Sequence, residues 1–267
     1  MKNYPRIYSL STLGLIHHYE NDYLFHNMRT DFVGDSGSGK SIIADLLQLI
    51  FVGSEMFESA TRTMDEKREL DGLVLRTPHK GIDIGYAFLN IEIQSRHYIV
   101  IGCYLESNSK RTKPFIIQGS SDPKANLLPI GQPLQTKDFK REGNICPLDD
   151  LLSQMEEKGL FLSYWETVKP YHRILYIHDI LPLDLASNEK TLKDYASVIR
   201  SFSRGKTIDT SNSNNLKQFI FGTEKIKENR KKYEDALKDF TDTIFNYNQN
   251  LNTIKILTDK EKALSTL

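Results

Sequence analysis

The stretch FVGDSGSGKSIIADLL, residues Phe32–Leu47, is the most distinctive part of the sequence. From Gly34 to Ser41 it fits the pattern G-x-x-x-x-G-K-[ST] at every fixed position. The residues before it, MRTDFV at 28–33, predict a strand, and the apolar residues from Ile42 to Ile50 recur at helical spacing. A strand, a glycine-rich loop and a helix in this order are typical of a phosphate-binding P-loop.

The residue types in the loop predict its chemistry. The glycines let backbone N–H groups approach phosphates closely and take positive φ. Lys40 is predicted to reach the β- and γ-phosphates of ATP, and the Ser41 hydroxyl to bind Mg²⁺. The alternative, a Gly/Ser-rich turn that matches by chance, fits poorly with such complete flanks. The match predicts binding of ATP and Mg²⁺ but not hydrolysis, through Gly34, Asp35, Ser36, Gly37, Ser38, Gly39, Lys40 and Ser41.

The composition suits a cytoplasmic globular protein. Lys and Arg total 35, as do Asp and Glu, so any contact with nucleic acid needs a local basic patch. No apolar run reaches ~18 residues and the N-terminus lacks a signal-peptide core, so no membrane partner is expected. Cys103 and Cys146 lie too far apart to predict a disulfide framework or a zinc site. The histidines lack metal-ligand spacing, so packed or surface roles are expected for them.

Beyond the P-loop, the pattern predicts an α/β fold with a mixed or mainly antiparallel sheet. Apolar runs predict strands at 81–93 and 97–106, with SRH as the turn between them, and a third strand at 113–119. Residues 120–144 are polar and rich in Pro and Gly, which indicates a loop or an insertion. Capping and periodicity predict helices at 147–159 and 187–202.

The stretch from Gly222 onward predicts the start of a long coiled-coil helix. Apolar side chains recur there in steps of 4 and 3: Tyr233, Leu237, Phe240, Ile244, Tyr247, Leu251 and Ile254. A lone helix with such a stripe needs a partner, and the alternative is a terminal helix packed on a compact domain. We therefore expect a head lobe at 1–221 and an arm at 222–267, with the helix interrupted where the sequence stops.

Several of these residues resemble one protein family. The inner SGSGKS and the strands predicted near the N-terminus resemble the N-terminal head segment of the SMC superfamily of chromosome ATPases, whose heads are ABC-type. The stretches ESATRTMDEKRELDGLVL and GIDIGYAFLNIEI are similar to the MukB-like branch, which includes the SMC-type subunits of the Wadjet and Lamassu defence systems. Ile42 departs from the Ser or Thr usual in these ATPases, which removes a possible phosphate contact.

The resemblance implies an ATPase that works only as a dimer. ABC-type hydrolysis needs a Walker B strand ending in Asp-Glu and a Ser-Gly-Gly signature loop, and neither is complete here. In ILYIHDI at 174–180, Ile180 stands where the catalytic Glu belongs, and SFSRGK at 201–206 only echoes a signature. We expect both parts in a C-terminal lobe beyond the coil. Two copies would then sandwich ATP between their heads, and this chain alone would be inactive.

Further site residues follow from the resemblance. ABC-type heads use a glutamine that links Mg²⁺ and the attacking water to the rest of the head. Its candidates are Gln118, Gln132, Gln135 and Gln154. Gln135 is preferred because it stands at a loop-to-helix junction at a plausible distance from the P-loop; for each of the four, a solvated glutamine is the alternative. Arg62 and Arg68 are candidates for an arginine that senses the nucleotide or DNA, with surface ion pairs as the alternative.

A local basic group predicts phosphate contacts with DNA where the arm leaves the head, as in SMC-like heads. Its members are Lys190, Lys193, Arg200, Arg204, Lys206, Lys225 and Arg230. A solvated helix face balanced by nearby carboxylates is the alternative. The MukB-like resemblance suggests accessory subunits in a bacterial defence or chromosome- and plasmid-maintenance complex. Two other hypotheses are a repair ATPase of the RecF or RecN kind and a coiled-coil scaffold that holds ATP without hydrolysing it.

Overall fold

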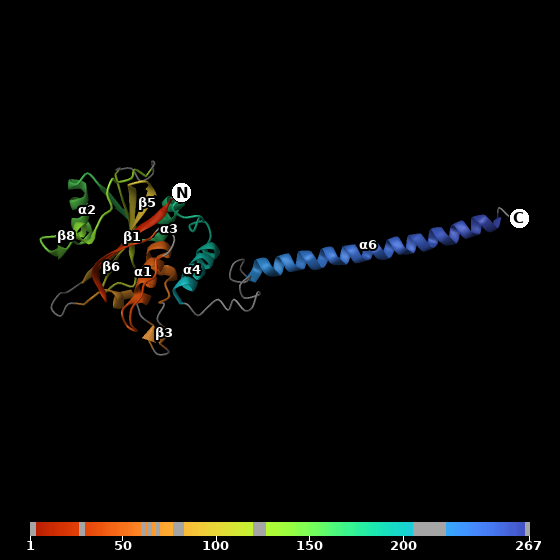
Figure 1. Ribbon diagram of the computed structural model, residues 1–267, viewed down its shortest axis with the longest axis horizontal. Coiled ribbons are helices and arrows are strands. Elements are labelled where there is room, and N and C mark those ends of the chain that lie inside the picture. Colours follow the sequence, from red (N-terminus) through yellow and green to blue (C-terminus); the bar gives the residue numbers. More distant parts are fainter. Residues whose placement is uncertain are drawn as a thin grey trace. The chain divides into compact units, whose positions relative to one another are not determined.

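The computed structural model describes residues 4–26, 30–59, 62–63, 66–67, 70–76, 83–119, 127–204 and 223–264. For some of them, including 62–63, 200–204 and 223–232, only the backbone is described. The chain divides into two compact units, Met1–Thr207 and Ile208–Leu267, whose elements are labelled in Figure 1. The predicted boundary between residues 221 and 222 lies outside the described residues and stays a prediction.

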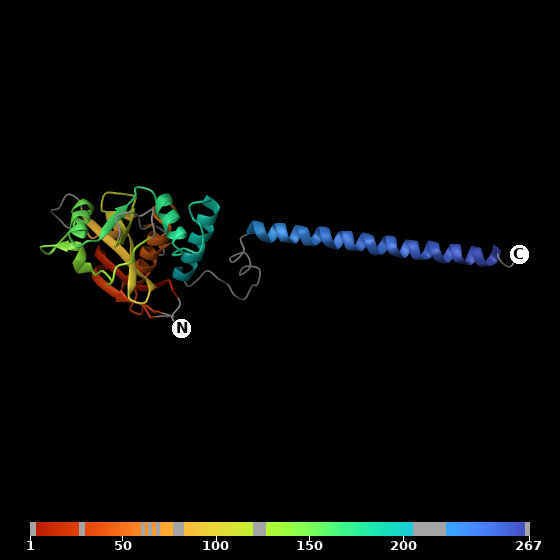
Figure 2. The same ribbon diagram turned by 90° about the horizontal axis from the view of Figure 1, so that it is seen from above.

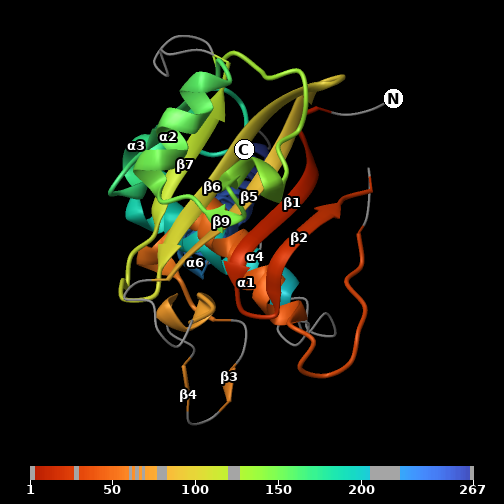
Figure 3. The ribbon, with the colours of Figure 1, turned by 90° about the vertical axis from the view of Figure 1, so that its left-hand side faces the viewer.

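The first unit is built on a six-stranded antiparallel sheet with the strand order β10-β7-β6-β5-β1-β2. Its strands are β1 Arg6–Leu15, β2 His18–Leu24, β5 Ile84–Gln94, β6 His97–Glu106, β7 Lys113–Gln118 and β10 Phe161–Tyr164. Figure 3 shows β2 at one edge of this sheet. Two short hairpins are formed by β3 Arg62–Thr63 with β4 Glu66–Lys67 and by β8 Lys140–Arg141 with β9 Asn144–Ile145. The predicted α/β class and mainly antiparallel sheet are confirmed.

Helices cover both faces of the sheet, because side chains along a strand point alternately to its two faces. In β5 and β6, Leu89 and Ile101 belong to one apolar cluster, and Phe88 and Val100 belong to the other. Helices α1, α3 and α4 pack on the first face, and α2 with η3 packs on the second (Figures 2 and 3). The helices are α1 Lys40–Val52, η1 Ser54–Met56, η2 Leu70–Leu73, η3 Thr136–Phe139, α2 Leu148–Glu157, α3 Val168–Ile177 and α4 Glu189–Arg204.

Helix α1 follows the P-loop as predicted and is held by its apolar side chains. Ile42, Leu46 and Ile50 are fully buried against the sheet, and each contributes roughly 1.5–3 kcal/mol of hydrophobic stabilisation. The helix also buries two polar side chains, which bind the segment that follows it. Asp45 accepts a hydrogen bond from the Ser59 hydroxyl at 3.0 Å, and Gln48 donates one to a carbonyl of that segment at 3.1 Å. The packing of α1 and these two hydrogen bonds therefore fix the position of its first turn.

The strand predicted at 28–33 is wrong where the structure describes it. Residues 30–33 adopt no regular structure, and residues 28 and 29 lie outside the described residues. A strand forms only where a neighbour supplies its ladder hydrogen bonds, and the described part of the sheet ends at β2. Val33 is accordingly 93% exposed.

The segment at 174–180 is not a Walker B strand. It is the end of helix α3 and the turn after it, with Asp179 at φ 56°. The residues Tyr171 and Leu175, four apart, are buried against the α1 face, which is the spacing of a helix and not of a strand. The Tyr171 hydroxyl also donates to the Ile50 carbonyl at 2.9 Å. This finding agrees with the absence of a complete Walker B motif in the sequence.

Two loop and turn predictions are refined, and two helix predictions are confirmed. The turn at 95–96 joins β5 to β6 as predicted, with Arg96 at φ 59°. The insertion predicted at 120–144 is irregular from 127 to 135, and then contains η3 and β8; residues 120–126 lie outside the described residues. The helices predicted at 147–159 and 187–202 are confirmed as α2 and α4, and Asn188 caps α4 through a 2.8 Å bond from Lys190 N–H.

In the second unit, α6 runs as one helix from Thr223 to Leu264. The predicted heptad side chains from Tyr233 to Ile254 all lie on it and are 44–68% exposed. At 1.5 Å per residue, this helix extends over about 63 Å. The long helix is confirmed, and its apolar seam has no cover among the described residues.

His172 in α3 is a buried histidine that stays neutral. It is fully buried, and its Nε2–H donates to the Phe51 carbonyl at 3.0 Å. Its Nδ1 has no hydrogen-bond partner in the described part of the chain. Burial lowers the pKa of His172 from 6.5 to about 4, because a proton on Nδ1 would lie in apolar surroundings.

We predict that His172 makes the protein less stable as the pH falls. Above pH 6.5 the side chain is neutral in both states, but between 6.5 and about 4 only the unfolded chain takes up the proton. The loss by pH 4 amounts to about 3 kcal/mol at 1.36 kcal/mol per pKa unit. Urea unfolding across this range should show a flatter profile for His172→Gln. The matched control, exposed His97→Gln, should keep the wild-type slope; equal slopes in all three proteins would contradict the assignment.

Candidate functional site

The P-loop joins directly to the first turn of α1. Gly37 and Gly39 have φ of 84° and 88°, a backbone conformation that favours glycine. The Gly39 carbonyl accepts hydrogen bonds from Ile42 N–H at 2.8 Å and Ile43 N–H at 3.4 Å. No side chain caps the helix at Gly39. The helix terminus is thus left to bind an anion through its backbone.

Lys40 extends back over the loop from the start of α1. Its Nζ lies 2.6 Å from the carbonyl oxygens of Gly34 and Asp35 and 3.2 Å from Ser38 Oγ. The residue is exposed, so the ammonium group is accessible to a ligand. Ser41 follows on the first helical turn and is half-buried. The structure therefore brings the predicted residues from Gly34 to Ser41 into one loop centred on a cation.

The turn between β1 and β2 packs against the end of this loop. His18 is buried, with Nε2 2.9 Å from the Gly39 carbonyl and Nδ1 2.7 Å from the Tyr23 hydroxyl. A carbonyl can only accept, so Nε2 carries a proton and donates to Gly39, while Nδ1 shares a hydrogen bond with the Tyr23 hydroxyl. Burial raises the pKa of Tyr23, which keeps that hydroxyl protonated. The sequence predicted a packed or surface histidine here, and only the fold brings it to the loop.

An aromatic group flanks the other end of the P-loop. The rings of Tyr23 and Phe32 meet edge-on with centroids 5.6 Å apart, and Phe25 meets Phe32 at 5.9 Å. Phe25, Phe32 and Lys40 also line a cavity of about 540 Å³, together with apolar residues of α1 and α4 such as Leu47 and Tyr195. The phosphate-binding loop thus adjoins a mainly apolar cavity.

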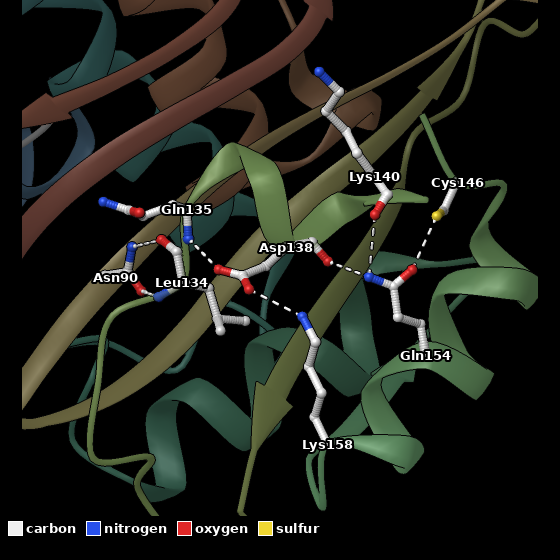
Figure 4. A network of polar contacts seen from close by, with 8 residues as sticks. All are labelled: Asn90, Leu134, Gln135, Asp138, Lys140, Cys146, Gln154 and Lys158. Carbon is white, nitrogen blue, oxygen red and sulfur yellow. Dashed lines mark hydrogen bonds and ion pairs between the residues drawn. The ribbon is translucent and has the colours of Figure 1, made fainter. Parts of the chain in front are cut away.

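Gln135, the preferred metal-site glutamine, stands at the start of η3. Its backbone N–H donates to Asp138 Oδ2 at 2.9 Å, and Lys158 binds the other oxygen of that carboxylate at 2.9 Å (Figure 4). The preceding residue, Leu134, exchanges two hydrogen bonds with the Asn90 side chain, at 2.8 and 2.9 Å. Gln135 itself is exposed and belongs to the structure of this turn.

The sheet lies between Gln135 and the P-loop. Leu134 and Phe139, on either side of the turn, belong to the apolar cluster on the α2 face, whereas α1 packs on the opposite face. The structure therefore does not bring Gln135 to Ser41. A shared contact of the two side chains with Mg²⁺ stays a prediction that this arrangement does not support.

The other predicted residues are placed only in part. The backbone of Arg62 lies in β3, and Arg68 lies outside the described residues. Lys190 and Lys193 lie on the first turns of α4, where Lys193 Nζ binds Glu189 at 2.7 Å and lowers the pKa of that carboxyl. For Arg200 and Arg204 in α4, and for Lys225 and Arg230 in α6, only the backbone is described; Lys206 lies outside the described residues.

The described residues contain neither a cluster of metal-ligating side chains nor a membrane-spanning helix. No group of three or more His, Cys, Asp or Glu residues within the described ranges could hold a metal ion. Mg²⁺ bound with a nucleotide needs no such group, because phosphate oxygens and water supply most of its ligands. Likewise, none of the described helices is long and apolar enough to cross a membrane.

Comparison with protein families matches residues 6–225 to the family described as MukB N-terminal. The matched range begins at β1, includes the P-loop and all strands of the sheet, and ends in the first turn of α6. A search of curated proteins finds no match. The family match therefore covers the whole described part of the first unit from Arg6 onward.

We predict that Gly39→Ala destabilises the protein more than Gly37→Ala. Both substitutions put a side chain at positive φ, which costs about 1–2 kcal/mol. A Cβ at residue 37 would meet nothing within 4 Å, whereas one at residue 39 would lie 2.6 Å from His18 Nε2 and 2.9 Å from His17 Cβ. Urea unfolding should show an additional loss of roughly 1–3 kcal/mol for Gly39→Ala. Equal losses would contradict the packing of the β1–β2 turn on the loop.

Proposed function

Because this chain belongs to the MukB N-terminal family of SMC-like ATPase heads, we propose that it binds ATP with Mg²⁺ at its P-loop and supplies one half of an ATPase site. The observation that carries the proposal is the position of Lys40. Its Nζ lies inside the loop, 2.6 Å from two loop carbonyls, at the N-terminus of the buried helix α1. A cation next to uncapped helix N–H groups is what a triphosphate requires.

The residues of the loop would act as follows. Lys40 Nζ would exchange its contacts with the Gly34 and Asp35 carbonyls for oxygens of the β- and γ-phosphates. Backbone N–H groups of the loop would donate to the same phosphates, and the glycines would let them approach. Ser41 would offer its hydroxyl as a protein ligand to Mg²⁺. When bound, Mg²⁺ would offset the negative charge of the triphosphate.

The other half of the site would come from elsewhere. ABC-type hydrolysis needs a carboxylate at the end of a Walker B strand, but residues 174–177 belong to helix α3. We therefore propose that a further lobe supplies the Walker B carboxylate, and that a second copy supplies a signature loop across a head-to-head dimer. The accessible Lys40 and the incomplete catalytic set support this arrangement. Closure of the two heads on ATP would be the step that hydrolysis reverses.

The arm and the basic residues would connect this site to DNA. The exposed heptad seam of α6 supports pairing with a second helix in a coiled coil. Lys190 and Lys193 lie at the start of α4 and are proposed to contact DNA phosphates; Lys193 also binds Glu189. Arg62 and Arg68 are proposed as sensors of nucleotide or DNA. A role in a bacterial defence or plasmid-maintenance complex, with accessory subunits, is proposed from the MukB-like resemblance.

We predict that Lys40→Ala abolishes most nucleotide affinity. Loss of charge-assisted hydrogen bonds worth about 1.5–3 kcal/mol should weaken binding roughly 10- to 150-fold. Isothermal titration with ATP and Mg²⁺ would measure the change. Lys137→Ala, in η3 on the other face of the sheet, is the matched control and should bind like the wild type. Full affinity in Lys40→Ala would contradict the proposed site.

We also predict that the protein by itself hydrolyses almost no ATP. None of the described strands ends in the Asp-Glu pair of a Walker B strand, so phosphate release at saturating ATP and Mg²⁺ should not exceed the background measured with Lys40→Ala. Adding a second polypeptide that carries the missing motifs should be required for turnover. A rate on the order of 1 s⁻¹ from this chain alone would instead indicate a self-contained P-loop enzyme.

A further inference from the structure

We infer that His18 is a positioning residue for the P-loop, and that with Tyr23 it fixes both ends of the loop to strand β2. The inference rests on the proposed function, since a role in affinity presupposes that the loop binds a nucleotide. It goes beyond that function because His18 and Tyr23 belong to no part of the phosphate-binding motif. Both residues come from the edge strand that precedes the loop in the sequence.

At the C-terminal end of the loop, His18 holds one peptide group. Its Nε2–H donates to the Gly39 carbonyl at 2.9 Å, and the same oxygen accepts from Ile42 N–H in the first turn of α1. In a planar trans peptide, the carbonyl and the following N–H point in opposite directions. Because His18 holds the Gly39 carbonyl toward the hairpin, the Lys40 N–H points away from the hairpin. On that side of the peptide the N–H is open to a ligand.

At the N-terminal end of the loop, the same pair acts through an aromatic contact. The Tyr23 hydroxyl lies 2.7 Å from His18 Nδ1, and the Tyr23 ring packs edge-on against Phe32, two residues before Gly34. The side chains of His18, Tyr23 and Phe32 thus form a continuous path from one end of the loop to the other. Residues 30–35, which carry Phe32, have no strand hydrogen bonds of their own, so this aromatic contact is one of their attachments to the sheet.

A glycine-rich loop needs such attachments more than an ordinary loop does. Glycine loses more backbone freedom on ordering than any other residue, so an unattached loop would have to be ordered by the ligand itself. Gly39 cannot provide a side-chain cap, and none is present at this helix terminus. Its site also excludes a larger residue, because a Cβ there would lie 2.6 Å from His18 Nε2. The close fit of Gly39 and His18 is what a preorganised loop requires.

The test compares His18→Ala, His18→Gln, Tyr23→Phe and the control His97→Ala in the full chain. His97 is exposed at the start of β6, and its ring bonds the Ser95 carbonyl of its own turn. Two quantities are measured for each protein. The first is the affinity for ATP with Mg²⁺ by isothermal titration, with Lys40→Ala as the weak-binding reference. The second is amide hydrogen exchange over residues 34–43 in the protein without nucleotide.

The expected results follow from the contacts. His18→Ala should weaken binding about 5- to 30-fold, as expected for one lost buried hydrogen bond, and should speed exchange at Ile42 and Ile43. His18→Gln should recover most of both, because its amide can donate to the Gly39 carbonyl. Tyr23→Phe keeps the ring and loses the hydroxyl, so its effect should be smaller and in the same direction. If His18→Ala does not fold, Tyr23→Phe and His18→Gln still decide the question.

The outcomes distinguish failure of the positioning role of His18 from failure of the proposed nucleotide binding. Wild-type binding that Lys40→Ala weakens, with affinity and exchange unchanged in His18→Ala and Tyr23→Phe, overturns the inference and leaves the proposed function standing. The inference is also overturned if His18→Ala weakens binding without faster amide exchange, or if His18→Gln binds no better than His18→Ala. In either case, loss of the hydrogen bond to the Gly39 carbonyl would not be the cause of the weaker binding. If the unaltered protein binds no ATP, the proposed function and the affinity role of His18 are both overturned.

Discussion

The packing of α1 against the sheet is the constraint on which the candidate site depends. Ile42, Leu46 and Ile50 bury one face of this helix against strands β1, β5 and β6, so the position of its first turn is not adjustable. The P-loop must then reach that turn from the edge of the sheet, past the hairpin of β1 and β2. Gly39 is the residue at which this becomes possible, because it takes positive φ and leaves room for His18.

This geometry is the reason why we propose that the chain supplies only the phosphate-binding half of an ATPase site. A loop and one helix terminus are enough to bind phosphate oxygens, and the first unit provides both. Hydrolysis needs a carboxylate opposite the loop, and the one segment of the chain that approached a Walker B pattern folds as helix α3 because Tyr171 and Leu175 pack on the α1 face. The chain's membership of the MukB N-terminal family supports an ATPase head in general.

The elements with strong local patterns were predictable. The alternation in β5 and β6, the helical spacing in α1 and the heptad steps in α6 each reflect which side chains one element buries, so they are present in the sequence. The strand predicted before the P-loop failed for a different reason. Phe32 and Val33 have strand-forming side chains, but a strand exists only with a partner, and β2 is the last described strand on that side. Gln135 was chosen for its place at a loop-to-helix junction, which carries no information about the face of the sheet on which that junction packs.

The sequence by itself determined the P-loop motif on which the proposed phosphate binding rests, because Lys40, Ser41 and the glycines stand within eight consecutive positions. It likewise determined the long helix with its apolar seam. Only the tertiary structure decided which residues meet the loop from outside. His18 lies 21 residues before Gly39, and no spacing rule relates them; the hairpin turn and the burial of α1 bring the ring to the carbonyl. Contacts of this kind depend on how elements pack against one another, and that information is spread over the whole core.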